Sequence, residues 1–168
     1  VGIATTALKA DMLSDSVYKK VVDLMCSLNK HASEAAISCG VKGMTDITGF
    51  GLIGHAYEMA VSSDVSFRIK ADKIPFLPDI KEFASMGILP AGLYKNKKYF
   101  DGKVKIAPGV SEDVVDIVFD PQTSGGLLIS VSERKAEGLI EILLAKGVHQ
   151  ACIVGNVENY HDYSVILE

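Results

Sequence analysis

The sequence predicts an α+β domain in which helices pack on a mixed or antiparallel sheet. Apolar residues recur at helical spacing after Ser14 and again after Ser132, which indicates two amphipathic helices. Apolar and polar residues alternate along residues 64–70, which is typical of a half-buried strand. The remaining helical and extended patterns follow one another without strict strand–helix alternation, so a doubly wound parallel sheet is not expected.

The predicted helices are placed by their apolar spacing and by residues that commonly end helices. The cluster Ser14–Asp15–Ser16 is typical of a helix N-terminus, and Gly40, Gly87 and Gly147 stand where helices commonly stop. The predicted helices cover approximately residues 17–28, 30–39, 50–62, 79–86 and 132–146.

The predicted strands are short apolar or alternating runs bounded by glycine, proline and polar residues. They cover residues 41–47, 64–70, 114–119, 127–131, 151–157 and 163–167. Residues 71–78 contain Pro75 and Pro78 and are predicted to form a loop. Little regular structure is predicted for residues 88–110, and a loop of this length is usually functional or mobile.

Length and composition favour one globular domain over residues 1–168. The chain is 48% hydrophobic and 23% charged, which excludes a disordered chain and allows a sizeable core. No apolar run approaches the ~20 residues that span a bilayer, and no signal peptide is visible, so no membrane partner is expected. The first residue is Val1 rather than Met, which predicts a cut or processed end and a fragment of a longer protein.

The charge pattern does not favour direct nucleic-acid binding. The net charge is −4, and Arg68 and Arg134 are the only arginines. The one dense basic run, "KNKK" at residues 95–98, precedes Tyr99 and Phe100 and is interpreted as a solvated loop.

The cysteines and histidines predict neither a disulfide framework nor a zinc site. Three cysteines at wide spacing fit reduced thiols in a cytoplasmic protein. Cys26 and Cys39 fall on apolar helical positions, so both are predicted to be buried. The histidines are scattered singly, which excludes zinc-type ligand spacing.

The stretch "TDITGFGLIGH" at residues 45–55 leaves three interpretations open. Gly49, Gly51 and Gly54 form a GxGxxG, which can cradle a dinucleotide pyrophosphate, and Asp72 follows Gly49 by 23 residues, near the spacing of a ribose-binding acid. Alternatively, Asp46 is one oxygen ligand of Mg²⁺, with glycines that turn and pack the chain. In the third interpretation, Asp46 caps the following helix or forms a local ion pair.

A second glycine turn, "DPQTSGG" at residues 120–126, precedes a predicted strand. Gly125 and Gly126 could present backbone N–H groups to an anion. They equally suit a bulge or a tight entry into the strand.

Four segments together resemble the C-terminal half of the selenophosphate synthetase (selenide, water dikinase) family. They are "GIATTALKADML" at residues 2–13, "MTDITGFGLIGHAYEMA" at 44–60, "LPAGLYKNKKYF" at 89–100 and "DPQTSGGLLISV" at 120–131. They lie in the family's order, and the resemblance as a whole covers nearly the whole chain. The resemblance implies the α+β fold of the C-terminal domain of aminoimidazole ribonucleotide synthetase.

The resemblance also implies a reaction, in which ATP, selenide and water yield selenophosphate, AMP and orthophosphate with Mg²⁺. Asp46 matches the family's magnesium-binding aspartate in this half, and Thr45, Thr48 and Gly49 are expected near the ATP phosphates. His55 is expected only to lie nearby or to pack.

The resemblance places the catalytic residues outside this chain. The family's nucleophilic cysteine or selenocysteine, its catalytic lysine and most of its metal-binding aspartates belong to the N-terminal half, so no catalytic residue is expected here. The expected partners are that N-terminal domain and a second copy in a homodimer. The alternatives are another ATP-dependent synthetase of the superfamily, active in purine biosynthesis or hydrogenase maturation, a purely structural module, or a dinucleotide-binding module.

Overall fold

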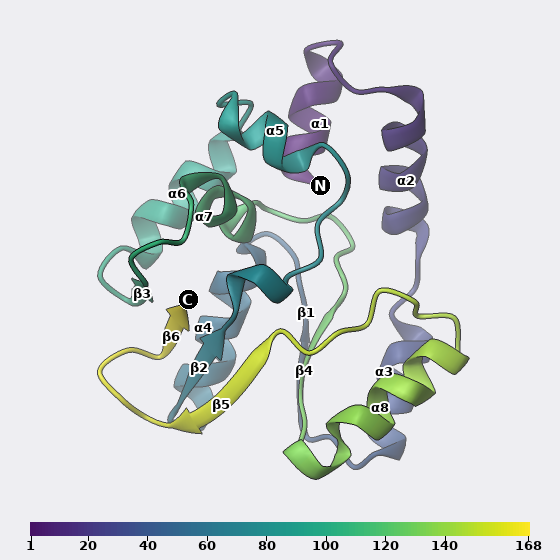
Figure 1. Ribbon diagram of the computed structural model, residues 1–168, viewed down its shortest axis with the longest axis vertical. Helices are drawn as coiled ribbons and strands as arrows, with labels where there is room; N and C mark the ends of the chain where they lie inside the picture. The colour runs from purple at the N-terminus through teal and green to yellow at the C-terminus, as the bar shows by residue number, and fades with distance from the viewer.

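The computed structural model describes residues 1–168 and confirms the α+β class (Figure 1). The helices are α1 Gly2–Lys9, α2 Asp15–Cys26, α3 Lys30–Ser38, α4 Gly51–Ser63, α5 Ile80–Ser85, α6 Ala91–Phe100, α7 Glu112–Phe119 and α8 Glu133–Ala145, with one 3₁₀ turn at Ala71–Lys73. The strands are β1 Gly43–Asp46, β2 Val65–Ile69, β3 Val104–Ile106, β4 Leu127–Ser130, β5 Gly155–Asn159 and β6 Val165–Leu167.

The strands form one mixed sheet and one separate antiparallel ribbon. The mixed sheet has the order β3-β6-β2-β5, in which β6 runs parallel to both β2 and β3 while β5 runs antiparallel to β2. The ribbon pairs β1 with β4 in antiparallel register, with Gly43 opposite Ser130 and Asp46 opposite Leu127. The prediction of a mixed or antiparallel sheet is therefore confirmed.

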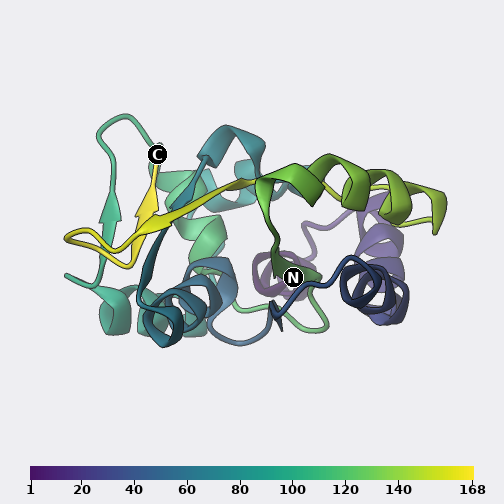
Figure 2. The ribbon, with the colours of Figure 1, turned by 90° about the horizontal axis from the view of Figure 1, so that it is seen from below.

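The β1–β4 ribbon stands between a larger and a smaller lobe. The larger lobe comprises α1, α2, α4–α7 and the mixed sheet, and the smaller lobe is the pair α3 and α8, which lie together at one end of the molecule (Figures 1 and 2). Side chains of successive strand residues point to opposite faces. Accordingly, Leu127 and Ile129 pack against the smaller lobe, whereas Leu128 packs against the larger one.

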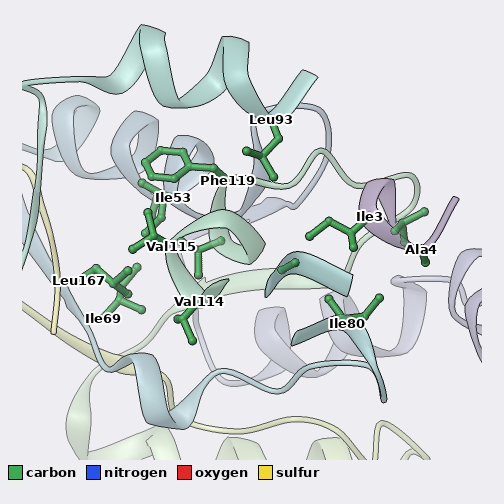
Figure 3. Close-up of a cluster of buried hydrophobic side chains, with 14 of the residues drawn as sticks. Ile3, Ala4, Ile53, Ile69, Ile80, Leu93, Val114, Val115, Phe119 and Leu167 are labelled. Carbon is green, nitrogen blue, oxygen red and sulfur yellow. The ribbon is translucent and has the colours of Figure 1, made fainter. Parts of the chain in front are cut away.

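The larger lobe contains most of the buried apolar surface. Its core joins 22 buried residues, among them Ile3, Ile53, Leu93 and Leu167, which α1, α4, α6 and β6 contribute (Figure 3). The smaller lobe has a cluster of four buried residues from α3 and α8. Ala32 and Ala35 lie on α3, where small side chains allow close contact with Leu139 and Leu143 of α8.

Most predicted elements are confirmed, with small shifts at their ends. Ser14 caps α2 because its side-chain oxygen accepts a hydrogen bond from the Val17 amide. Helices α3, α4, α5 and α8 and strands β1, β2, β4 and β6 lie where helices and strands were predicted. Strand β5 begins at Gly155 rather than at residue 151, and α1 was not predicted.

The strand predicted at residues 114–119 is wrong, because this segment is helix α7. Consecutive valines suggested a strand, since β-branched residues favour extended structure. Glu112 and Asp113 in the first turn, after Ser111 at the N-cap position, are the helix signal that outweighs them. Val114, Val115 and Val118 are buried as a helical face.

The absence of regular structure predicted for residues 88–110 is also wrong. The segment contains helix α6, which follows Pro90 at its N-cap position, and strand β3. Leu93, Asn96 and Phe100 form the buried face of α6. The basic run at residues 95–98 therefore lies on a helix and not in a solvated loop, and its lysines lie outside the buried face.

The predicted burial of two cysteines is wrong as well. Cys26 is exposed and Cys39 is half-buried, and both are free thiols, as is Cys152. Cys26 is the last residue of α2, where the apolar spacing no longer faces the core. None of the helices is long and apolar enough to cross a lipid bilayer.

Candidate functional site

The two glycine-rich segments singled out in the sequence lie side by side. The Ile47 amide donates to the Gly126 carbonyl at 2.9 Å, and the Gly125 amide donates to the Ile47 carbonyl at 3.1 Å. The Gln122 amide donates to the Thr48 carbonyl at 3.0 Å. These hydrogen bonds extend the β1–β4 ribbon into its turns, so "TDITG" and "DPQTSGG" form one structural unit.

Gly125 permits the close approach of these two segments. A Cβ atom at this position would lie 2.3 Å from the Ile47 carbonyl oxygen, which is far inside van der Waals contact. The Gly125 carbonyl in turn accepts a hydrogen bond from the Asn29 side chain at 2.9 Å. The second glycine turn is thus held from both sides, and the role of Gly125 is a close backbone contact.

The three glycines of the first motif have different surroundings. Gly51 has a φ of +71°, and a Cβ there would lie 2.8 Å from the Val118 carbonyl oxygen. A Cβ at Gly54 would lie 2.8 Å from the Phe100 ring. Gly49 is exposed, and a Cβ there would meet no atom within 4 Å. Gly51 and Gly54 therefore serve the turn and the packing of α4, whereas packing within this chain does not explain Gly49.

The strand topology excludes the dinucleotide interpretation. A dinucleotide-binding unit needs the strand before the glycines to run parallel to the next strand in one sheet. Here β1 pairs antiparallel with β4, and β2 belongs to the other sheet. Asp72, the candidate ribose-binding acid, lies in an exposed 3₁₀ turn beside Lys73.

Asp46 neither caps a helix nor forms an ion pair. It is the last residue of β1 and is exposed. The N-cap position of α4 is Phe50, and no side chain caps that helix. This leaves an unpartnered carboxylate, a hard oxygen ligand of the kind that Mg²⁺ prefers.

The donor set at Asp46 fits one part of a shared magnesium site. No group of three or more His, Cys, Asp or Glu side chains in the chain could hold a metal ion alone. Mg²⁺ commonly keeps several waters and takes one or two carboxylates together with substrate phosphates. A single free carboxylate therefore suits a site completed by phosphates and by another domain.

The threonines of the motif differ in position. Thr45 lies opposite Leu128 in the ribbon, whereas Asp46 lies opposite Leu127, so the strand alternation separates their side chains. Thr48 is half-buried, and its hydroxyl lies 3.0 Å from His55 Nε2. His55 Nδ1 lies 3.1 Å from Glu58 Oε2, one turn further along α4.

Asn96 fixes the glycine turn from the opposite side. Its side-chain amide donates to the Gly49 carbonyl at 2.9 Å and to the Phe119 carbonyl at 3.0 Å. Asn96 is 7% exposed and lies on α6. One buried side chain therefore ties the motif to both α6 and the end of α7.

Asp120, the acid of the second glycine turn, has a structural role. It is 2% exposed, and its carboxylate accepts hydrogen bonds from the Ile3 amide and from the Gln122 side chain, each at 2.9 Å. Burial raises the pKa of Asp120 above its usual range, although the hydrogen bond from the Ile3 amide opposes this effect. Because its partners already satisfy it, Asp120 is not a candidate metal ligand.

The large groove of about 2850 Å³ between the lobes is not the Asp46 site. Its lining includes Ile47, Gly125 and Leu127, together with residues of α8. Asp46, Thr48 and Gly49 are absent from that lining and lie outside the groove.

The comparisons with known proteins agree with the α+β fold of this chain. The family model described as "AIR synthase related protein, C-terminal domain" matches residues 1–168. The chain belongs to this family. It therefore shares the C-terminal domain of the AIR synthase related proteins, as the resemblance implied.

Individual relatives of this family domain carry a more specific name. The chain is 51% identical over 166 residues to the selenide, water dikinase of Caldanaerobacter subterraneus subsp. tengcongensis. The aligned residues make up 98% of this chain and 48% of that protein. The chain is 45% identical over 166 residues to selenide, water dikinase 2 of Peptoclostridium acidaminophilum, covering 99% of this chain and 48% of that protein. The chain thus spans about half the length of the curated relatives it matches.

The sequence interpretation missed several residues that shape this site. Asn96 stood within the quoted segment "LPAGLYKNKKYF" but received no role, because that segment was taken for a loop. The contact of Asn29 with Gly125 spans 96 positions and has no local signal. The His55–Glu58 pair was detectable, because residues three apart on a helix are neighbours.

Proposed function

We propose that this chain is the C-terminal half of a two-domain cytoplasmic selenide, water dikinase. The observation that carries the proposal is the free carboxylate of Asp46 in a turn whose backbone is fixed by "DPQTSGG" and by Asn96. The names of the relatives and the four matching segments support the same reaction. Residues 1–168 form its C-terminal domain, and the full enzyme acts as a homodimer.

The full protein converts ATP, selenide and water into selenophosphate, AMP and orthophosphate. The stoichiometry sends one phosphoryl group to selenium and another to water. Both transfers depend mostly on positioning and on charge neutralisation around the phosphates. When bound, Mg²⁺ neutralises phosphate charge, and the N-terminal half supplies the reacting groups and the other ligands.

The residues of this chain hold one side of the nucleotide. Asp46 supplies one oxygen ligand to Mg²⁺ from the end of β1. Thr45, Thr48 and Gly49 lie near the ATP phosphates, and Gly49 leaves room for them because no atom of this chain lies within 4 Å of a Cβ built there. With one proposed metal-ligating carboxylate and without the family's nucleophile, residues 1–168 alone do not turn over ATP.

Product analysis of the full-length protein tests this proposal. We expect AMP, orthophosphate and selenophosphate to form only when selenide is present, as followed by chromatography and ³¹P NMR. Residues 1–168 alone, with a circular dichroism spectrum that shows a folded domain, are expected to give no product. Selenide-independent ATP turnover to ADP would favour another synthetase of the superfamily, and turnover by residues 1–168 would contradict the assignment of the reacting groups.

A further inference from the structure

Three side chains form a hydrogen-bonded chain beside Asp46 that the proposed reaction does not yet use. Thr48 Oγ1 lies 3.0 Å from His55 Nε2, and His55 Nδ1 lies 3.1 Å from Glu58 Oε2. His55 is 8% exposed, while the Glu58 side chain is 54% exposed. The row of hydrogen bonds thus runs from the solvent-exposed Glu58 through the buried His55 imidazole to the hydroxyl of Thr48, two residues after Asp46.

The Thr48 backbone does not need this side-chain contact to keep its place. Its carbonyl accepts hydrogen bonds from the Gln122 amide and from the Gly51 amide, each at 3.0 Å. The Ile47 amide and carbonyl are both paired with the second glycine turn. His55 therefore acts on the orientation of the Thr48 hydroxyl rather than on the path of the chain.

The chemistry of the three groups sets the direction of each hydrogen bond. A carboxylate can only accept, so Nδ1 carries the proton in the tautomer of His55 that has a single N–H group. His55 Nε2 is then an acceptor, and the Thr48 hydroxyl must donate to it. The lone pairs of Thr48 Oγ1 remain free to accept.

We propose that His55, held by Glu58, is a positioning residue that keeps the Thr48 hydroxyl as an acceptor two residues after Asp46. A carboxylate and a hydroxyl oxygen that both act as acceptors suit a hydrated divalent cation and not a phosphate oxygen, which needs donors. Thr48 then accepts a hydrogen bond from a water of the Mg²⁺ shell. This inference rests on the proposed function, because it concerns the cation held at Asp46.

The protonation of His55 gives a readout that requires no metal. In full-length protein labelled with ¹⁵N at histidine, His55→Asn assigns the His55 signals. We expect a protonated Nδ1 and an unprotonated Nε2 at neutral pH without added metal. A proton on Nε2, with or without one on Nδ1, would make Thr48 the acceptor of that bond and would overturn the inference.

Mn²⁺ binding to full-length protein, followed by electron paramagnetic resonance in the presence of ATP, tests the consequence. Thr48→Val and His55→Asn should weaken Mn²⁺ binding about tenfold, the size expected when an outer-shell partner of a metal ligand is lost. Thr48→Ser and His55→Gln should bind close to wild type, since Ser keeps the hydroxyl donor and Gln supplies an amide oxygen that can accept in place of Nε2. Thr5→Val is the control, because its hydroxyl donates to the Gly2 carbonyl within α1.

The outcomes separate this inference from the proposed function. If Asp46→Asn weakens Mn²⁺ binding and Thr48→Val does not, the metal role of Asp46 stands and the role of the hydrogen-bonded chain is overturned. If Asp46→Asn itself binds like wild type, both fail. If His55→Asn lowers the melting temperature but binds Mn²⁺ like wild type, the hydrogen bonds of Thr48, His55 and Glu58 serve packing alone. That result also overturns the inference.

Discussion

The two lobes differ in how they are stabilised, and the candidate site lies at one end of the ribbon between them. The larger lobe has a core of 22 buried residues, whereas the smaller lobe has a cluster of four. The β1–β4 ribbon contributes side chains to both, through Leu128 on one face and Leu127 on the other. Asp46 is at the end of this ribbon, so the proposed metal ligand is held in place by backbone pairing and not by contacts of its own side chain.

The acids of this region differ in whether their carboxylates have hydrogen-bond or ion-pair partners within the chain. Asp116 and Asp120 are buried and fully partnered, and both belong to the larger lobe. Asp46 is exposed and has no partner. Asp46 therefore differs from these two paired acids in having a carboxylate that is free for the proposed metal site.

The largest expected effect comes from the two apolar clusters. Ile53→Ala in the larger core should lower the free energy of unfolding by about 4 kcal/mol, because the surrounding core cannot collapse into the cavity. Leu139→Ala in the smaller cluster should cost about 2 kcal/mol, since α3 and α8 can move together. Urea unfolding of residues 1–168 measures both, and an equal or reversed pair of costs would contradict the difference between the lobes.

The junction of the two glycine turns should be the next most sensitive place. Gly125→Ala should cost about 3 kcal/mol, because the added Cβ would lie 2.3 Å from the Ile47 carbonyl oxygen. The matched control is Gly138→Ala in α8, where a Cβ meets nothing within 4 Å and alanine favours the helix. That control should gain roughly 0.5–1 kcal/mol. Thermal unfolding checks both signs, and a neutral Gly125→Ala would show that the close contact is dispensable.

Lys97 should matter more than its basic neighbours on α6. Its ammonium group lies 3.0 Å from the Asp116 carboxylate, which is buried, and it also pairs with Glu112. Lys97→Met should cost about 2 kcal/mol, because it leaves the Asp116 carboxylate buried without a partner. Lys95→Met, at an exposed position of the same helix, should be close to neutral. Equal stabilities of the two variants in urea would rule out this role for Lys97.

The smallest expected effect is a pH dependence at the start of α7. A hydrogen bond with the Ser111 side chain lowers the pKa of Asp113, despite some burial. A carboxyl with a lowered pKa in the folded state stabilises the fold above its unfolded pKa and loses that contribution as the pH falls through the folded value. Asp113→Asn should therefore lose less stability than wild type between about pH 5 and pH 3. Parallel stability curves for the two proteins over this range would contradict the prediction.

The sequence predicted those parts of the fold in which local pattern and tertiary packing agree. The alternation in β2 and the amphipathic spacing of α2 and α8 were sufficient, because each element buries the face that its pattern marks. Helix α7 was taken for a strand because its valines favour strands, and only the acids of its first turn indicate a helix. Helix α6 was missed because the lysines between its buried positions Leu93, Asn96 and Phe100 make the apolar spacing of the helix hard to recognise.

The sequence nominated Asp46 for the candidate site but did not predict the contacts that surround it. Asp46 came from a motif and its resemblance to a family. The pairing of Ile47 with Gly125 and Gly126 joins segments far apart in the sequence, which no local pattern reports. The amide contact of Asn96 with the Gly49 carbonyl is of the same kind.

The most direct test of the central claim replaces Asp46 in the full-length protein. Selenide-dependent AMP formation is measured for Asp46→Asn across a Mg²⁺ titration, with circular dichroism as the folding control and Asp72→Asn as the matched substitution at an exposed acid. We predict an intact fold and activity that is lost at low Mg²⁺ and partly restored at about tenfold higher concentration, with Asp72→Asn unchanged. Wild-type kinetics for Asp46→Asn would contradict the metal-ligand role and would show that Asp46 is an ordinary surface acid.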